Sequence, residues 1–173
     1  PEIVEQLRSL RVSATRIHLS RNGISVPPDS RVDNIKESFG WAPDTKVLGI
    51  FGRLTPIKGH QVLFEAVKTV CSKDPSVRCL VVGDGPLMAD LVQCVQRLEL
   101  EHFVHFTGFR GDIGSLMRMC DVVCQPSFSE GLPYTVLEAA AAGKPLVLSA
   151  VGGLPDNFQH ARTARFVNPG DDK

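Results

Sequence analysis

Two glutamates with seven residues between them are the side chains best suited to chemistry in this chain. Glu130 lies in a polar loop marked by glycine and proline, and Glu138 lies in the first turn of an alanine-rich helical stretch. A helix N-terminus attracts anions through its dipole and its free amide groups, and carboxylates accept hydrogen bonds from hydroxyl groups. The pair therefore predicts a ligand with phosphates in its middle and hydroxyl groups at both ends.

Both glutamates also have a structural interpretation. Thr135 and Glu138 fit the S/T-x-x-E capping box of a helix start, so Glu138 could serve only to close that box. Glu130 stands between Ser129 and Gly131 and could be a solvated loop residue. The residues alone leave both roles open at Glu138, while the position of Glu130 favours contact with a ligand.

Basic residues stand where phosphate could be bound. The stretch from Gly52 to Gly59 follows a strand-length apolar run and precedes an amphipathic helical pattern. Its first glycine allows a ligand to approach the backbone, and the guanidinium of Arg53 and the ammonium of Lys58 both suit phosphate oxygens. Two solvated cations in an ordinary loop are the alternative, but the position of the loop favours phosphate.

No metal site and no dinucleotide fingerprint are predicted. The histidines have no metal-ligand spacing, and no Asp-x-Asp pair could hold a divalent ion against a diphosphate, which would need Arg53, Lys58 and backbone amides instead. Gly83 and Gly85 begin a G-x-G-x-x-G pattern, but Met88 replaces its third glycine. Asp84 is therefore expected to be a turn or cap residue.

Composition limits the class of protein. The 173 residues fit one domain with some additional chain, and the equal numbers of basic and acidic residues argue against nucleic-acid binding. No apolar run is long enough to span a membrane. The five cysteines include no C-x-x-C pair and are expected to be reduced thiols of the core, which predicts a cytoplasmic protein. Because the chain begins at Pro1 without methionine, we expect a piece of a longer protein.

Strand-length apolar runs alternate with amphipathic helical patterns from about residue 45 onward. Strands are expected near residues 47–51, 77–82, 103–106, 121–124, 145–149 and 164–167, and helices near residues 62–71, 87–98, 113–119 and around Glu138. Such alternation predicts an α/β fold, a Rossmann-like doubly wound parallel sheet covered on both faces. Ligands of these sheets bind beyond the carboxyl ends of the strands, where the loops described above lie.

The first forty residues follow a different pattern. A helix is expected near residues 3–10 and a strand near residues 16–19, followed by a polar stretch that includes Pro27 and Pro28. We interpret residues 1–40 as the tail of a missing N-terminal domain with its linker. Residues 41–173 are then a nucleotide-sugar-binding, Rossmann-like domain, truncated at its C-terminus.

Together these residues resemble the C-terminal, donor-binding half of the retaining GT-B glycosyltransferases called glycosyl transferases group 1. The resemblance extends in order, at the family's spacing, over about residues 45–172. The matching stretches are Gly52-Arg53, Lys58-Gly59-His60, residues 81–86, Phe106-Thr107-Gly108-Phe109, Glu130-Gly131-Leu132-Pro133, Glu138-Ala139, residues 151–155 and residues 168–171. Asn22-Gly23-Ile24 also resembles the family's segment before the interdomain linker.

The resemblance implies transfer of a sugar, of the hexosyl type, from a UDP-, GDP- or ADP-linked donor with retained anomeric configuration and without a metal cofactor. Arg53 and Lys58 would hold the diphosphate and stabilise the leaving group, and Glu130 would bind hydroxyls of the transferred sugar; these are the expected catalytic residues. In this family the departing phosphate is usually pictured as taking the acceptor's proton, so Glu130 is not assigned as a nucleophile.

The remaining site residues would bind the nucleotide-sugar. Glu138 would accept hydrogen bonds from the ribose, and the backbone of Phe109 and Arg110 would lie beside the base. Amides around Tyr134 and Thr135 would contact the diphosphate. The implied binding set is Gly52, Phe109, Arg110, Gly131, Leu132, Pro133, Tyr134, Thr135 and Glu138.

The chain departs from the family pattern in its last loop. Asp156 stands where the family usually has glutamate, and Ala161 and Ala164 stand where it often has glycine, which restricts the backbone. We expect the acceptor-binding N-terminal domain to be missing from this segment, so that the segment alone is inactive and any membrane association is made by that domain. Polysaccharide biosynthesis is the commonest context of the family.

Three alternatives remain at the level of the sequence. Another GT-B enzyme, such as a sugar-nucleotide epimerase or a phosphorylase, would share the fold, although the spacing of Glu130 and Glu138 favours a transferase. A non-catalytic binding module is the second alternative. An NAD-type Rossmann protein is disfavoured by Met88, which interrupts the glycine fingerprint.

Overall fold

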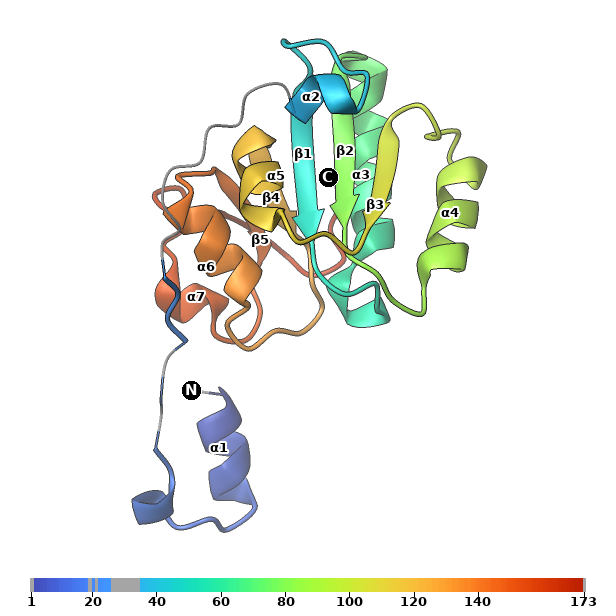
Figure 1. Cartoon of the computed structure of the whole chain (residues 1–173). Coiled ribbons are helices and arrows are strands. Elements are labelled where there is room, and N and C mark those ends of the chain that lie inside the picture. Colours follow the sequence, from blue (N-terminus) through green and yellow to red (C-terminus); the bar gives the residue numbers. More distant parts are fainter. Residues whose placement is uncertain (1, 19, 21, 26–34, 173) are drawn as a thin grey trace.

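A six-stranded parallel sheet organises the computed structural model, which describes residues 2–18, 20, 22–25 and 35–172 (Figure 1). The strands lie in the order β3-β2-β1-β4-β5-β6, and every neighbouring pair is parallel. Their bounds are β1 Lys46–Phe51, β2 Val77–Val82, β3 Val104–Gly108, β4 Val122–Gln125, β5 Leu146–Ser149 and β6 Arg165–Val167. The predicted α/β, Rossmann-like fold is confirmed.

Helices cover both faces of this sheet, which explains why the strands are apolar almost throughout. Alternate residues of β1 point to opposite faces, so Val47 and Phe51 belong to one buried cluster and Ile50 to the other. The first cluster includes residues of α5 Ile113–Met119, α6 Tyr134–Ala141 and α7 Leu154–Asn157. The second includes residues of α3 His60–Lys73 and α4 Met88–Arg97.

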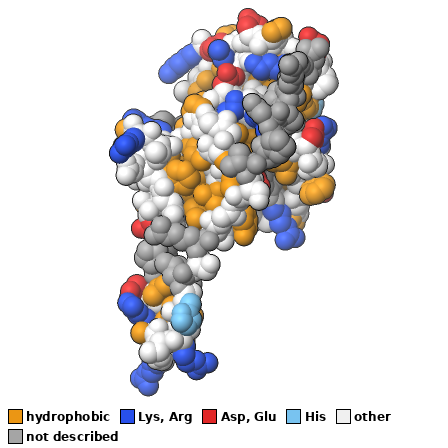
Figure 2. All heavy atoms as spheres, turned by 60° about the vertical axis from the view of Figure 1, so that its left-hand side comes forward, with side chains coloured by type: hydrophobic (Ala, Val, Ile, Leu, Met, Phe, Trp, Pro, Cys, Tyr) orange, Lys and Arg blue, Asp and Glu red, His pale blue; other side chains and the backbone are white. Residues whose placement is uncertain are grey.

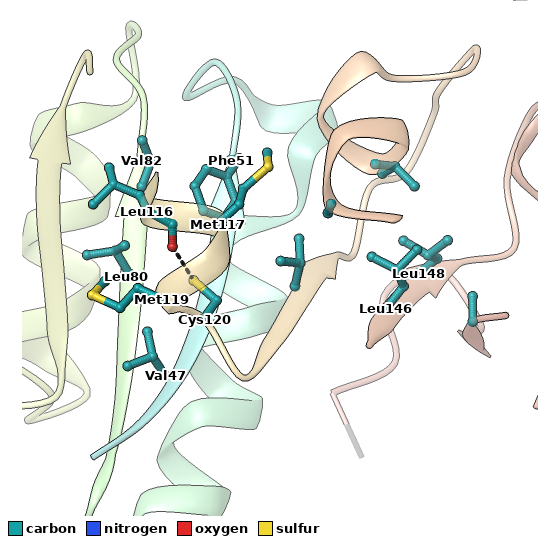
Figure 3. Close-up of a cluster of buried hydrophobic side chains, with 14 of the residues drawn as sticks. Val47, Phe51, Leu80, Val82, Leu116, Met117, Met119, Cys120, Leu146 and Leu148 are labelled. Carbon is teal, nitrogen blue, oxygen red and sulfur yellow. Dashed lines mark hydrogen bonds between the residues drawn. The ribbon is translucent and has the colours of Figure 1, made fainter. Parts of the chain in front are cut away.

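The first cluster packs α5 against the centre of the sheet. Figure 3 shows Leu116 and Met117 beside Phe51 of β1 and Val82 of β2, and all of these side chains are buried. The five cysteines are buried and free, as predicted. Burial raises the pKa of Cys120 and of Cys124 to about 12, so these thiols stay protonated and serve as apolar packing groups.

The strand order places a topological switch point between β1 and β4. From β1 the chain winds outward through β2 and β3, and it then returns to add β4, β5 and β6 on the other side. Loops that leave neighbouring strands in opposite directions separate at such a point, and ligands of open α/β sheets bind there. The loops after β1 and β4 contain Lys58 and Glu130.

The N-terminal part contains α1 Glu2–Ser9, the 3-10 turn η1 Ala14–Arg16 and α2 Ile35–Ser38. In Figure 1, α1 lies apart from the sheet. The predicted helix near residues 3–10 is confirmed, but the strand near residues 16–19 is wrong, because η1 occupies its start and no described strand pairs with it. Leu19 lies outside the described residues.

The proposed linker falls mostly on residues 26–34, which lie outside the described residues, so the domain boundary stays a prediction. Ile35, Phe39 and Trp41 pack against the first buried cluster. Among the described residues, no helix is long and apolar enough to cross a bilayer. On the side that carries α6 and α7, apolar side chains gather in the centre of the face and charged ones lie toward its edges (Figure 2).

Candidate active site

A hollow of about 320 Å³ opens at the carboxyl ends of β1, β2 and β3. Its walls come from the loops after these strands and from the starts of α5 and α6. The lining residues are Phe51, Gly52, Arg53, Val82, Gly83, Asp84, Phe109, Arg110, Ile113 and Thr135. Five residues of the predicted site therefore lie around one cavity, although they are up to 83 positions apart in the sequence (52 to 135).

Two glycines bring the β2 loop against the β1 loop. A Cβ on Gly83 would lie 1.9 Å from the carbonyl oxygen of Gly52, and one on Gly85 would lie 2.5 Å from that of Leu54. The Leu54 amide donates to the Asp84 carbonyl at 2.9 Å, and the Asp84 carboxylate accepts from the Gly85 amide at 2.7 Å. These glycines are thus needed for loop packing, and the carboxylate of Asp84, which lines the hollow, is engaged by the Gly85 amide.

The turn η2 Pro56–Lys58 directs Lys58 toward the same place. Pro56 begins the turn and Gly59 ends it with a φ of 68°, in the left-handed region. A Cβ on Gly59 would lie 2.0 Å from the carbonyl oxygen of Pro126, so the turn is in contact with the loop after β4. The Lys58 Nζ lies 3.9 Å from where a Cβ on Gly52 would stand, at the edge of the hollow.

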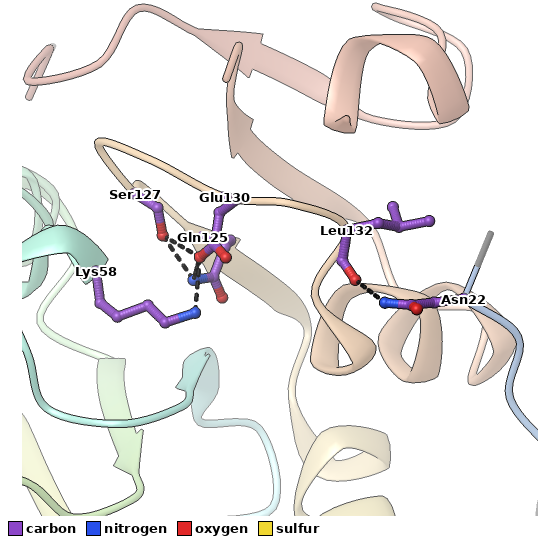
Figure 4. Close-up of polar contacts among 6 residues, drawn as sticks. All are labelled: Asn22, Lys58, Gln125, Ser127, Glu130 and Leu132. Atoms are coloured by element: carbon purple, nitrogen blue, oxygen red, sulfur yellow. Dashed lines mark hydrogen bonds and ion pairs between the residues drawn. The ribbon is translucent and has the colours of Figure 1, made fainter. Parts of the chain in front are cut away.

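Glu130 is the centre of a compact polar cluster (Figure 4). Its Oε1 accepts hydrogen bonds from Lys58 Nζ at 2.7 Å, from Ser127 Oγ at 2.7 Å and from Gln125 Nε2 at 2.9 Å. The side chains of Lys58 and Glu130 are only 16% and 8% exposed, so solvent screens their ion pair weakly. The positive charge of Lys58 thus balances the negative charge of Glu130 within this cluster.

The helix after Glu130 begins two residues earlier than a capping box of Thr135 and Glu138 requires. Pro133 is the N-cap residue, no side chain caps the helix, and Tyr134 is its first residue. The capping-box interpretation of Thr135 and Glu138 is therefore wrong, and Glu138 lies in the second turn instead of the first. Proline fixes φ near −65°, and the −68° of Pro133 allows the extended conformation of an N-cap without side-chain help.

The N-terminal amides of α6 remain available on the hollow side. The amides of Val136 and Leu137 donate to the carbonyl oxygen of Pro133, at 3.2 and 3.4 Å. Tyr134 and Thr135 supply the two amides before these, and Thr135 lines the hollow. Glu138 lies one turn later and is half-buried, and its carboxylate does not cap the helix.

Phe109 and Arg110, which follow β3, form another wall of the hollow. The Phe109 side chain is 83% exposed. The Arg110 guanidinium binds both carboxylate oxygens of Asp112, with Nε 2.8 Å from Oδ1 and the terminal nitrogen 2.7 Å from Oδ2. The Arg110 side chain is thus engaged by Asp112, and the backbone contact with the base that the resemblance implies stays a prediction.

Several residues that shape this site were not predicted. Gln125 and Ser127 bind Glu130, while a Cβ on Gly152 would lie 1.6 Å from the Glu130 carbonyl oxygen, so this glycine lets the β5 loop support the glutamate. Asn22 donates to the Leu132 carbonyl at 2.7 Å (Figure 4). The one signal in the sequence was a glutamine at the end of an apolar run.

His60 is a buried histidine beside the ion pair. It is 3% exposed, and neither ring nitrogen has a hydrogen-bond partner among the described residues. Burial, and then the charge of Lys58, lowers the pKa of His60 to about 4. The ring is therefore neutral at pH 7, and it contributes no charge to the site. No group of three potential ligand side chains that could hold a metal ion occurs in the described part of the chain.

Comparison with known proteins gives the same family as the residue pattern. Glycosyl transferases group 1 matches residues 31–173. A D-inositol 3-phosphate glycosyltransferase of Actinosynnema mirum is 36% identical over 144 residues, which cover 76% of this chain and 34% of the relative. The 2-deoxystreptamine glucosyltransferase of Streptomyces kanamyceticus is 30% identical over 177 residues, covering 94% and 46%.

Solved structures with the same fold are also known. Crystal structures of HepE from Anabaena, in complex with UDP and glucose or with UDP-glucose, have a TM-score of 0.75 and 33% identity over 82% of this chain and 39% of theirs. A glycosyltransferase from Rickettsia africae shares the fold with a TM-score of 0.86 at 21% identity, over 99% and 48%. The chain thus spans less than half the length of these relatives, and it belongs to the glycosyl transferases group 1 family.

Proposed function

We propose that this chain is the donor-binding part of a retaining glycosyltransferase, which transfers a hexosyl group from a nucleoside diphosphate to an acceptor. One observation carries the proposal: the Lys58–Glu130 ion pair lies at the edge of a hollow lined by Arg53 and Thr135. Cations for phosphate and a carboxylate for hydroxyls are thus adjacent. The likeness to HepE, whose structures contain UDP-glucose, supports this choice of ligand.

The donor would lie across the hollow in the order base, ribose, diphosphate and sugar. Phe109 and Arg110 would flank the base, and Glu138 would accept hydrogen bonds from the ribose hydroxyls. Arg53, Lys58 and the amides of Tyr134 and Thr135 would bind the diphosphate. Glu130, with the backbone of Gly131, Leu132 and Pro133 around it, would bind the transferred sugar.

The reaction would break the bond between the anomeric carbon and the diphosphate oxygen. The acceptor oxygen would form its bond on the same face, and its proton would pass to the departing phosphate. Arg53 and Lys58 would stabilise the charge that develops on that phosphate, which is the role a divalent metal has in other enzymes, so no metal is required. Because the departing phosphate takes the proton and no covalent intermediate is needed, we assign Glu130, whose Oε1 accepts three hydrogen bonds, to binding the sugar.

The rest of the protein would complete the enzyme. We propose that an N-terminal domain binds the acceptor and closes the cleft, so that residues 1–173 alone bind donor without transferring sugar. A cytoplasmic enzyme of polysaccharide biosynthesis is the proposed context, with any membrane association made by that domain.

The test is turnover of nucleotide-sugars by the intact protein, followed by proton NMR. We expect release of the nucleoside diphosphate with a product or freed sugar whose first-formed anomer matches the donor. Formation of the opposite anomer would contradict retention. Conversion of the donor into its epimer without release of nucleoside diphosphate would contradict transfer altogether.

A further inference from the structure

We infer that Gln125 and Ser127 are positioning residues, which hold one oxygen of the Glu130 carboxylate and leave the other oxygen to the ligand. This inference rests on the proposed function, because the ligand of the second oxygen is the sugar of the donor. It assigns a role to two side chains that lie behind Glu130 and outside the lining of the hollow.

The division between the two carboxylate oxygens is clear in the structure. Ser127 Oγ and Gln125 Nε2 donate to Oε1 at 2.7 and 2.9 Å, and Lys58 Nζ donates to the same atom at 2.7 Å (Figure 4). Within the described residues, no hydrogen bond or ion pair reaches Oε2, and this atom is not sealed from solvent. Oε2 is therefore the acceptor available to a hydroxyl group.

The Gln125 amide has only one favourable orientation. Its Nε2 also approaches Ser127 Oγ, at 2.7 Å, and turning the amide over would place its carbonyl oxygen against the Glu130 carboxylate. In the present orientation, Gln125 Oε1 is buried without a partner among the described residues. Glu130 thus determines how the glutamine lies.

Gln125 is a costly residue for this position. It is the last residue of β4 and is 0% exposed, like Ser127, and an unpartnered buried carbonyl destabilises the folded state. A leucine there would remove that cost. Residues that lower stability in this way are typical of functional sites, and the contact with Glu130 is the gain that explains the glutamine.

Neutral donors also keep Glu130 in place when Lys58 engages phosphate. The lysine side chain is flexible, and its ammonium lies between Glu130 and Gly52 at the edge of the hollow. The amide and the hydroxyl, both from the β4 segment, do not depend on the lysine. They add no charge, so the carboxylate remains a strong acceptor for the sugar.

The experiment compares ligands with and without the sugar, using the intact protein. Dissociation constants are measured for UDP and UDP-glucose, GDP and GDP-mannose, and ADP and ADP-glucose, and the pair that the wild type binds is kept. The variants are Gln125→Leu and Ser127→Ala, with Ser127→Thr as the conservative rescue. Ser149→Ala is the matched control, because Ser149 is also 0% exposed, ends β5 and has a hydroxyl without a partner in the described part of the chain.

We expect Gln125→Leu and Ser127→Ala to weaken binding of the nucleotide-sugar about tenfold, with binding of the nucleoside diphosphate unchanged. Ser127→Thr and Ser149→Ala should behave as wild type. Equal losses for both ligands, or no loss for either, would overturn the inference and leave the proposed function intact. If the wild type binds none of the diphosphates, the proposed function itself fails, and this inference fails with it.

Discussion

At the scale of single residues, the site depends on whether Lys58 can contact both the carboxylate of Glu130 and a bound phosphate. The lysine is bound to Glu130 at 2.7 Å, and the hollow with Arg53 lies on its other side. An ammonium group has three donors, so it can contact phosphate without leaving the carboxylate. The ion pair is thus compatible with a role for both residues in one bound donor.

Removing either of two charged side chains should weaken binding of the nucleoside diphosphate. We expect Lys58→Ala and Glu138→Ala each to cost about 1–3 kcal/mol in a calorimetric titration, because each loses a charged hydrogen bond to the ligand. Lys68→Ala, an exposed lysine on α3, is the matched control and should have no effect. Wild-type affinity in both site variants would disprove this assignment of the site.

His60 should make the fold sensitive to acid. Its pKa of about 4 lies below the 6.5 of an unfolded histidine, so the unfolded chain takes up the proton first as pH falls. The free energy of unfolding should therefore decrease between about pH 6.5 and 4, by about 2–3 kcal/mol. Burial also lowers the pKa of His105, which acts in the same direction.

Urea unfolding at a series of pH values measures this effect. His60→Gln should remove most of the decrease, whereas His102→Gln, at an exposed histidine, should leave it unchanged. An identical pH dependence in wild type and His60→Gln would show that His60 is not the group responsible.

At the scale of elements, the β5–β6 connection contains a strained alanine. Ala161 has a φ of 58°, in the left-handed region that favours glycine. The conformation costs an alanine about 1 kcal/mol, so Ala161→Gly should raise the free energy of unfolding by about 0.5–1 kcal/mol. Ala164→Gly should lower it by about 1 kcal/mol, because Ala164 is 6% exposed in the core and loses a buried methyl group.

Thermal or urea unfolding should show changes of opposite sign in the free energy of unfolding of the two variants. Both substitutions replace alanine with glycine three positions apart, so a general effect of glycine on the unfolded chain cancels between them. Destabilisation by Ala161→Gly would mean that this loop is not strained in solution.

The elements were largely predictable, because buried parallel strands leave a clear apolar pattern. The apolar residues 77–82 became β2, and residues 113–119 became α5, with the predicted bounds. Local patterns failed where tertiary contacts decide. The capping box of Thr135 and Glu138 does not form, because the helix begins directly after Pro133. Residues 16–19 do not form a strand, and none of the described strands pairs with them.

The site was predictable only in part for the same reason. The loops after β1 and β4 could be located, because ligands of doubly wound sheets bind at the switch point. The partners of Glu130 could not be predicted, because the conformation of the loop after β4 is what brings Gln125 and Ser127 into contact with it. Gly152 approaches it from the loop after β5, 22 positions further along the chain (130 to 152). No spacing rule indicates such contacts.

At the scale of the whole molecule, the chain covers 34% and 46% of two enzymes in its family. We propose that residues beyond this segment bind the acceptor. We predict that purified residues 1–173 bind donor but transfer no sugar, whereas the intact protein does. Turnover by the segment alone, above that of a Lys58→Ala control, would contradict the prediction.

The most direct test of the account is a calorimetric titration of this chain, and then of the intact protein, with UDP, GDP, ADP, dTDP and CMP, with and without EDTA. We predict that one nucleoside diphosphate binds and that EDTA does not change its affinity, because Arg53, Lys58 and backbone amides hold the phosphates. Binding that EDTA abolishes would contradict the metal-free site. Absence of binding to both chain and intact protein would contradict the central claim that this hollow holds a nucleotide-sugar.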